Sequence, residues 1–222
     1  MFIIMLGGPG SGKGSVGGIL ADYYKIPHIS TGDIFRSEIK NGTELGLKVK
    51  ELIANGQLVS DDLTIKIVEN RLLQPDCNNG AVLDGFPRTE AQAIALEKFM
   101  KENNRKIDSA VELDVSDEDL TIRIVNRLVC SNKECGESYN TVFMPPKIEG
   151  KCNKCGSDLY KRADDNEESV KNRLEVYHKQ SKEIIEFYKE RNLLYTVKPD
   201  IYSPTVLPDT VKTVEDYLDK IQ

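Results

Sequence analysis

The sequence of 222 residues contains no apolar stretch that approaches the length of a membrane span. It also lacks an excess of basic residues, because 30 lysines and arginines stand against 36 aspartates and glutamates, for a net charge of −6. There is therefore no global basic field to attract nucleic acid. It shows no internal repeat, low-complexity tract or signal-peptide pattern, so we expect a cytoplasmic protein without membrane or nucleic-acid partners.

Cysteine is scarce, but four of the five cysteines lie in two close pairs. Four residues separate Cys130 from Cys135, and two separate Cys152 from Cys155. This spacing is typical of a tetrahedral Zn²⁺ site built from four thiolates. A pair of disulfides is the alternative, which the reducing cytosol disfavours. Because four thiolates leave no open position, we predict a structural zinc and not a catalytic one.

A zinc-bearing segment can also bind nucleic acid. Such a site would need an excess of basic residues and aromatic side chains that stack on bases. The lysines around the cysteines are nearly balanced by acidic residues. Only Tyr139, Phe143 and Tyr160 could stack on bases in this segment. The composition therefore does not favour a nucleic-acid site.

A glycine-rich segment directly follows the first apolar run of the chain. Residues 7–15 read Gly-Gly-Pro-Gly-Ser-Gly-Lys-Gly-Ser, after Phe-Ile-Ile-Met-Leu at 2–6. The backbone N–H groups of such a loop, the N-terminus of a following helix and the charge of Lys13 can together hold a phosphate chain. Gly14 stands where the strict pattern has Ser or Thr, and Ser15 supplies the hydroxyl one position later. An ordinary strand–helix turn is the alternative, and it does not account for the lysine.

Apolar strands alternate with amphipathic helices along most of the chain. We predict strands at 2–6, 27–30, 81–84, 110–115 and 193–197, and helices at 13–24, 61–73, 89–103, 117–128 and 167–190. This alternation predicts an α/β fold, a P-loop parallel sheet with helices on both faces.

Two segments interrupt the alternation. Residues 30–59 predict a helical insert, and residues 127–164 predict a second insert with short β-hairpins around the four cysteines. The core domain would then comprise residues 1–29, 60–126 and 165–222.

Polar motifs follow two further strands at the point where each strand ends. Asp-Gly-Phe-Pro-Arg-Thr occupies 84–89, and Ser-Thr-Gly-Asp occupies 30–33 with Arg36 one turn later. Ligands of parallel sheets bind at the carboxyl ends of the strands, so both motifs are candidate site residues. Asp84 could orient a metal-bound water near the P-loop. The alternatives are a surface arginine at 88 and a plain helix cap at 30–33.

Four arginines flank the second insert. Arg123 and Arg127 lie four residues apart on a predicted helix and would share one face, and Arg162 and Arg173 lie on either side of the end of the insert. A solvated helix face is the alternative for the first pair. The position of this pair beside the cysteine segment favours an anion clamp.

Taken in this order, residues 7–15, 29–36 and 84–89 and the four-cysteine insert resemble the adenylate kinase family, in its zinc-bearing bacterial type. The resemblance extends to about residue 195. It implies a monomeric enzyme that transfers a phosphoryl group reversibly from ATP to AMP, giving two ADP, with Mg²⁺ bound alongside ATP and a structural Zn²⁺. The fold would be a P-loop core with an insert that binds the nucleoside monophosphate and a zinc-bearing lid. A kinase for UMP or CMP, and a zinc-ribbon adaptor that only binds nucleotide, are the alternatives.

The resemblance also implies roles for individual residues. On the ATP side it implies Gly10, Ser11, Gly12, Lys13, Gly14, Ser15, Arg127, Ser138 and Tyr139. On the AMP side it implies Thr31, Arg36, Gln57, Leu58, Val59, Gly85, Phe86, Pro87, Arg88, Gln92, Arg162 and Arg173, with Thr31 and Gln92 at the adenine. The implied catalytic residues are Lys13, Arg88, Arg123, Arg162 and Arg173, and the implied zinc ligands are Cys130, Cys135, Cys152 and Cys155.

The chain departs from the family pattern at four places. Val16 stands where Gln is usual, and Ser15 where Thr is usual. The first cysteine pair encloses four residues in place of two, and the residues after Val197 do not show the pattern expected beside the donor adenine. The last of these departures leaves the donor-base contact of the C-terminal segment unassigned.

Overall fold

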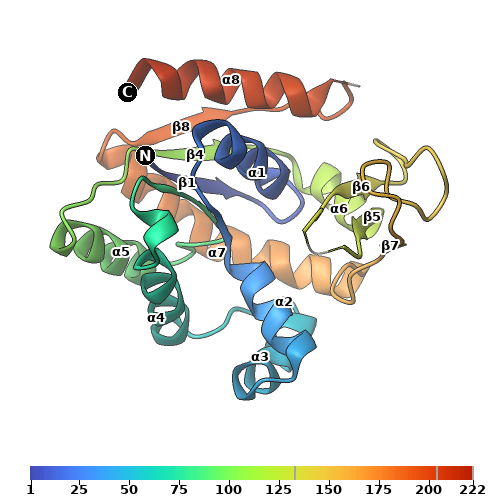
Figure 1. Cartoon of the computed structure of the whole chain (residues 1–222), viewed down its shortest axis with the longest axis horizontal. Helices are drawn as coiled ribbons and strands as arrows, with labels where there is room; N and C mark the ends of the chain where they lie inside the picture. Colours follow the sequence, from blue (N-terminus) through green and yellow to red (C-terminus); the bar gives the residue numbers. More distant parts are fainter. Residues whose placement is uncertain (133, 204, 222) are drawn as a thin grey trace.

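Five parallel strands form the central sheet of the computed structural model, which describes residues 1–132, 134–203 and 205–221 (Figure 1). The strands are β1 (Phe2–Gly7), β2 (His28–Ser30), β3 (Ala81–Asp84), β4 (Ser109–Leu113) and β8 (Leu194–Val197). Their order across the sheet is β2-β3-β1-β4-β8, and every neighbouring pair is parallel. All five strands predicted from the sequence are therefore confirmed.

Helices cover both faces of this sheet, as predicted. One face carries α1 (Lys13–Tyr24) and α8 (Val206–Ile221), and the other carries α4 (Asp61–Leu72), α5 (Glu90–Glu102) and α7 (Glu167–Glu190). Successive side chains of a strand point to opposite faces, so Ile3 and Met5 pack toward α1 and α8 while Ile4 packs toward α5 and α7. Burial on both faces explains why β1 is a continuous apolar run.

The helix α8 has no counterpart among the predicted elements. Its buried residues Val211, Val214 and Leu218 recur at helical spacing and pack with α1 against the sheet. Of the described helices, none is long and apolar enough to cross a membrane.

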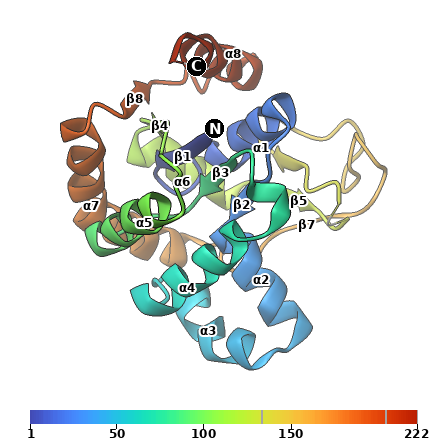
Figure 2. The ribbon, with the colours of Figure 1, turned by 60° about the vertical axis from the view of Figure 1, so that its left-hand side comes forward.

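Two segments project from the core as separate lobes (Figure 2). The first contains α2 (Thr31–Asn41) and α3 (Glu44–Ala54), which bury Phe35, Val49 and Val59 together. The second is a small antiparallel sheet in the order β6-β5-β7, built from β5 (Arg127–Cys130), β6 (Ser138–Asn140) and β7 (Leu159–Tyr160). The helical character of the first segment and the β-hairpins of the second both agree with the sequence prediction.

The helix predicted at 117–128 ends earlier than expected. The helix α6 spans Asp117–Val125, and Asn126 caps it through hydrogen bonds to the carbonyl of Ile122. Arg127 instead begins β5, because its pairing with Asn140 of β6 competes with continuation of the helix. The prediction that Arg123 and Arg127 share one helix face is therefore wrong.

Candidate active site

The P-loop connects the end of β1 to the start of α1. Two of its glycines cannot carry a side chain: Gly7 has φ +136° and Gly10 has φ +82°. A Cβ atom would lie 2.7 Å from the Leu113 carbonyl oxygen at Gly7, and 2.6 Å from Ile124 Cγ1 at Gly10. Lys13 Nζ donates a hydrogen bond to the Gly8 carbonyl at 3.1 Å, so its ammonium group folds back over the loop. The loop thus presents backbone N–H groups, a helix N-terminus and a cation to one small volume.

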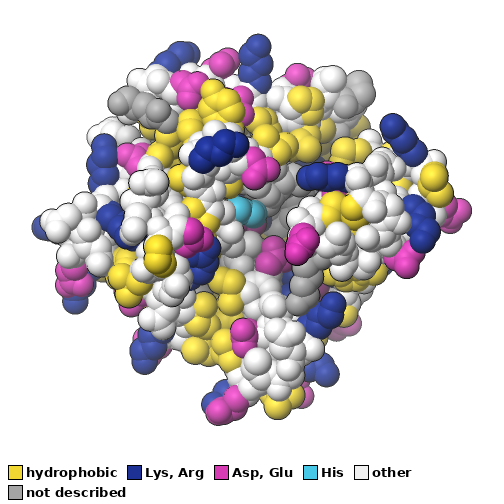
Figure 3. Space-filling view, in the orientation of Figure 1, with side chains coloured by type: hydrophobic (Ala, Val, Ile, Leu, Met, Phe, Trp, Pro, Cys, Tyr) yellow, Lys and Arg dark blue, Asp and Glu magenta, His cyan; other side chains and the backbone are white. Residues whose placement is uncertain are grey.

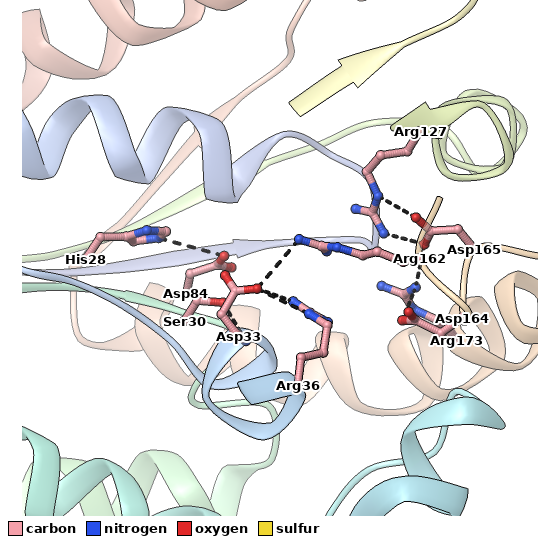
Figure 4. Close-up of polar contacts among 10 residues, drawn as sticks. All are labelled: His28, Ser30, Asp33, Arg36, Asp84, Arg127, Arg162, Asp164, Asp165 and Arg173. Atoms are coloured by element: carbon pink, nitrogen blue, oxygen red, sulfur yellow. Dashed lines mark hydrogen bonds and ion pairs between the residues drawn. The ribbon is translucent and has the colours of Figure 1, made fainter. Parts of the chain in front are cut away.

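Asp84 lies at the end of β3, beside the first turn of α1. A Cβ atom on Gly14 would lie 3.1 Å from Asp84 Oδ2, so the glycine at this position leaves room for the carboxylate. On its other side, His28 Nε2 lies 3.8 Å from the same oxygen (Figure 4). The Asp84 carboxylate and the Ser15 hydroxyl are hard oxygen ligands of the kind that Mg²⁺ prefers. The donor chemistry at the P-loop therefore fits a magnesium ion.

Among the predicted site residues, several buried hydrogen-bond donors have no partner in the described part of the chain. They are Ser11 Oγ, Arg123 Nη1 and Arg162 Nε. Arg123 reaches the loop directly, because its Nη2 lies 3.3 Å from the position of a Cβ atom on Gly12. Buried polar groups in proteins are normally hydrogen-bonded, so unpaired cationic donors indicate a site built to receive an anion.

The cations of the site also lower the pKa values of one another. Burial, together with the charges of Arg88, Arg173 and Arg127, lowers the pKa of Lys13 to about 8 against the opposing effect of Asp84. Burial likewise lowers the pKa of Arg173 to about 10, with Arg127 and Arg88 adding to the effect. Keeping Lys13 and Arg173 charged therefore costs free energy, and the negative charge of a bound polyphosphate would remove that cost.

This pKa shift makes nucleotide binding depend on pH. A bound phosphate stabilises the charged form of Lys13, so the affinity for ATP should fall as pH rises through about 8, where the free protein loses this proton. Between about pH 8 and about pH 9, the dissociation constant measured by calorimetry is expected to rise by about fivefold, because the protonated fraction of Lys13 falls by that factor. The Lys13→Met variant should bind more weakly and lose this dependence. An unchanged pH dependence in the variant would show that Lys13 is not the titrating group.

Most residues predicted for the AMP side meet in one pocket. Its lining includes Thr31, Arg36, Gln57, Leu58, Val59, Gly85, Arg88, Gln92 and Arg173. Phe86 is buried in the core instead, and Pro87 lines a neighbouring cavity. The sequence motifs at 30–36, 57–59 and 84–92 therefore converge, as parallel strands that end at the same edge of a sheet require.

The two residues predicted at the adenine are held in place by the protein. Thr31 donates a hydrogen bond to the Gly85 carbonyl at 2.9 Å. Gln92 donates to Asp61 at 2.8 Å and accepts from the backbone N–H of Arg88 at 2.8 Å. Gln92 thus fixes the turn that carries Arg88 as well as lining the pocket. No sequence motif assigns a role to Asp61, which orients the Gln92 amide.

Acidic side chains anchor the arginines of the site (Figure 4). Asp33 accepts a hydrogen bond from Arg36 at 2.7 Å and lies 3.6 Å from Arg162, so it joins the two projecting segments. Asp165, whose side chain is fully buried, accepts from Arg127 at 2.8 Å. Asp164 lies 3.2 Å from Arg173. Figure 3 shows the same mixture of both signs of charge around a hollow in this face of the molecule.

These acidic partners extend the site beyond the predicted residues. Asp33, Asp165 and Asp164 hold Arg36, Arg127 and Arg173, respectively, in defined positions. The sequence signals for them are the motif at 30–33, which ends on Asp33, and the pair of aspartates that closely follows Arg162. Neither signal reveals which arginine each aspartate holds.

The four cysteines converge in the second projecting segment. Their sulfur atoms all lie within 4.8 Å of one another, with 3.4 Å between Cys130 and Cys155 and 3.7 Å between Cys135 and Cys152. A tetrahedral zinc with bonds of about 2.3 Å places its sulfurs about 3.8 Å apart, so the cluster fits this ion. All four are free cysteines, which does not favour the disulfide alternative.

Comparison with known proteins identifies the family of the chain. Residues 5–193 match the sequence model of the family described as adenylate kinase. The adenylate kinase of Caldicellulosiruptor saccharolyticus is 53% identical over 196 residues, which are 88% of this chain and 90% of that protein. The chain belongs to the adenylate kinase family.

Two further relatives carry the same name at similar identity. The adenylate kinase of Clostridium botulinum is 50% identical over 197 residues, which are 89% of this chain and 90% of that protein. That of Acetivibrio thermocellus is 46% identical over 222 residues, which cover 100% of both chains. This adenylate kinase family member is accordingly an enzyme, a nucleoside monophosphate kinase.

Two predicted donor-side residues of this adenylate kinase family member lie in the cysteine segment. Ser138 is on β6, opposite Val129 of β5. Tyr139 is only 5% exposed, and its hydroxyl lies 3.5 Å from Cys152 Sγ and accepts a hydrogen bond from the Asn153 N–H. The Tyr139 side chain therefore supports the cysteine cluster, and any contribution to ATP binding would have to come from its backbone.

The unassigned C-terminal segment of this family member lies beside the lid. Tyr202 contacts Phe143 edge to face, with 5.8 Å between the ring centres, and its hydroxyl donates to Asp119 at 2.7 Å. The segment after Val197 thus contacts both the cysteine-containing segment and the start of α6. No sequence motif predicts this contact.

Proposed function

We propose that this enzyme catalyses reversible phosphoryl transfer from ATP to AMP, giving two ADP. One observation carries the proposal: the P-loop and the Thr31 pocket meet at a shared set of cations. Arg88 and Arg173 line both the pocket of Thr31 and Gln92 and the cavity beside Lys13. A donor and an acceptor phosphate held by these groups would face each other across a short distance.

The proposed chemistry requires alignment and charge neutralisation more than covalent help. Lys13, Arg123 and Arg127 would hold the donor phosphates, and Arg36 and Arg88 the acceptor phosphate. Arg162 and Arg173 would stabilise the charge that spreads over the transferring group. No general base is needed, because the attacking oxygen of a phosphate monoester is already anionic. Ser15 directly and Asp84 through water would hold Mg²⁺, which neutralises charge on the donor phosphates.

We propose that residues 30–59 and 127–164 move as inserts on a core of residues 1–29, 60–126 and 165–222. Their closure would exclude water and so suppress ATP hydrolysis. The Arg162–Asp33 pair at 3.6 Å supports this proposal, because it joins one insert to the other next to the phosphate-binding arginines.

Within the second insert we propose a structural Zn²⁺ at Cys130, Cys135, Cys152 and Cys155. The apolar cluster of this insert consists of only a few partly buried side chains around Tyr139, such as Leu128 and Leu159. A core of this size does not fold alone, so the metal would supply most of the stability of the insert. The need for reduced thiols favours the cytoplasm, and the origin of both pockets in one chain favours a monomer.

An acceptor panel tests the proposed substrate. With ATP and Mg²⁺, the wild-type protein should phosphorylate AMP with a higher kcat/KM than UMP or CMP. The Gln92→Leu variant should lose about tenfold or more in kcat/KM for AMP, because one buried hydrogen bond to the base and the support of Arg88 are both removed. Gln74→Leu, which alters an exposed glutamine outside the pocket, is the matched control. A preference for UMP or CMP in the wild-type protein would make the acceptor assignment wrong.

A further inference from the structure

A second cavity lies next to the AMP pocket, between the end of β1, the turn at 85–88 and α7. Its lining includes the cations Lys13, Arg88 and Arg173. The rest of the described wall is mainly apolar and includes Leu6, Leu58, Pro87, Val176, Ile184 and Ile185. The cavity therefore combines an anion-binding region with an apolar surface.

The cationic and the apolar residues that line this cavity are separated along α7. Arg173 and Ile185 both line the cavity, and the helical rise places them about 18 Å apart along the axis. Val176, Gln180 and Ile184 continue the wall between these positions. The cations therefore gather toward one end of the cavity, and the apolar side chains extend away from them along the helix.

The apolar branch of this cavity, which is the part lined by Val176, Ile184 and Ile185, is distinct from the pocket assigned to AMP. Both cavities share Arg88 and Arg173, but Thr31, Arg36 and Gln92 line only the AMP pocket. Conversely, Val176, Ile184 and Ile185 line only the second cavity. The proposed reaction uses the shared cations and the AMP pocket, and leaves the apolar branch without a role.

The chemistry of this branch defines what can fill it. An anion at the junction would satisfy cations whose pKa values burial has lowered, as it has for Lys13 and Arg173. Water gains few hydrogen bonds from side chains such as Val176 and Ile185, so a hydrocarbon chain is a better occupant of that wall. One molecule with both features would match the whole cavity.

We propose that this cavity binds phosphate monoesters that carry a short aliphatic chain. The phosphate would lie at Lys13, Arg88 and Arg173, and the chain would lie against the apolar wall of α7. Such a ligand occupies Arg88, which the proposed reaction uses for the AMP phosphate, and Lys13, which it uses for the donor phosphates, so it competes with AMP and also with ATP. Only this competition rests on the proposed function, because binding can be measured without any reaction.

A chain-length series tests the proposal. The dissociation constants of ethyl, butyl and hexyl phosphate, measured by calorimetry below their aggregation concentrations, should fall by about threefold to fourfold for each methylene added. A phosphate ester with an ether chain as long as hexyl should bind at least about tenfold more weakly than hexyl phosphate. Equal affinities along the series would overturn the proposal.

Two variants locate the chain. Val176→Phe fills the apolar branch and Ile185→Gln makes its wall polar, so both should abolish the chain-length dependence while inorganic phosphate still binds. Ile94→Gln alters an isoleucine of α5 that is 51% exposed and does not line the cavity, and it should keep the dependence. Thermal melting identifies a variant that fails to fold, and the chain-length dependence of the other variant then tests the proposal. A chain-length dependence that survives in a folded Val176→Phe or Ile185→Gln protein would place the chain elsewhere and overturn the proposal.

A parallel assay separates this inference from the proposed function. The same wild-type preparation is given ATP, AMP and Mg²⁺, and ADP is measured with and without hexyl phosphate. If ADP forms but hexyl phosphate neither binds nor raises the KM for AMP, the inference is wrong and the proposed function stands. If hexyl phosphate binds with the expected chain dependence but no ADP forms, the proposed function is wrong and the binding site stands.

Discussion

Replacing Arg88 with alanine is expected to lower kcat for ADP formation by a factor of about 100 or more. The Arg88 side chain enters both cavities and is fixed by a hydrogen bond from Nε to the Gly85 carbonyl at 2.8 Å. Its backbone N–H is held by Gln92, so the guanidinium is positioned before substrate binds. A preorganised cation that faces the transferring group stabilises the transition state more than the ground state, and its loss therefore appears in kcat.

Two further variants make the Arg88 experiment specific. Arg88→Lys keeps the charge but loses the planar fork, so its kcat should fall between the wild-type and alanine values. Arg191→Ala removes an arginine that pairs with Glu97 at 3.2 Å outside the site, and it should leave kcat within about twofold of wild type. A near-normal turnover of Arg88→Ala would remove this residue from the catalytic set.

Loss of the metal is expected to have the second large effect, on stability and activity together. The purified protein should contain about one zinc per chain, and a strong chelator should lower Tm by more than about 5 °C. Structural zinc contributes on the order of 10 kcal/mol to the folding of small zinc domains, and the apolar cluster around Tyr139 is too small to replace it. Because Arg127 and Arg162 lie at the edges of this insert, kcat should fall at least about tenfold as well.

Single cysteine variants test the same claim without a chelator. Cys152→Ser should lose the zinc and reproduce the lower Tm, since Cys152 is buried and its sulfur lies 3.7 Å from that of Cys135. Cys77→Ser is the matched control, because Cys77 is also buried but lies near Arg71 and Asp76, away from the cluster. It should keep the full zinc content. A protein without metal whose Tm does not respond to a chelator contradicts the structural-zinc proposal.

The elements of the core other than α8 could be predicted because local sequence determines them. The apolar run at 2–6 has side chains buried on both faces of the sheet, and a short run of this kind before a glycine-rich turn is typical of a doubly covered strand. The helix predicted at 167–190 has these bounds in the structure, where Asn166 caps its first turn by accepting from the Ser169 N–H. In the same way, Ser30 caps α2, so the cap proposed as an alternative exists and also brings Arg36 into the AMP pocket.

Other features depend on contacts between distant parts of the chain. The break after Val125 follows from the pairing of Arg127 with Asn140, which competes with a helix whose local sequence could continue. Asp33 and Arg162 are far apart in the sequence, and no spacing rule links them. The pattern could thus place an arginine near the site, but could not say which carboxylate holds it. Tyr202 is a further example, because its contact with Phe143 depends on where the lid lies.

The product balance of one reaction tests the proposed phosphoryl transfer from ATP to AMP most directly. Purified protein, ATP, AMP and Mg²⁺ are incubated together, and ADP and inorganic phosphate are both quantified. We expect two ADP for each ATP consumed and no phosphate above the enzyme-free control, because the cations direct the phosphoryl group to AMP and the closed inserts exclude water. Absence of ADP, or release of phosphate in place of it, would contradict the proposed transfer to AMP.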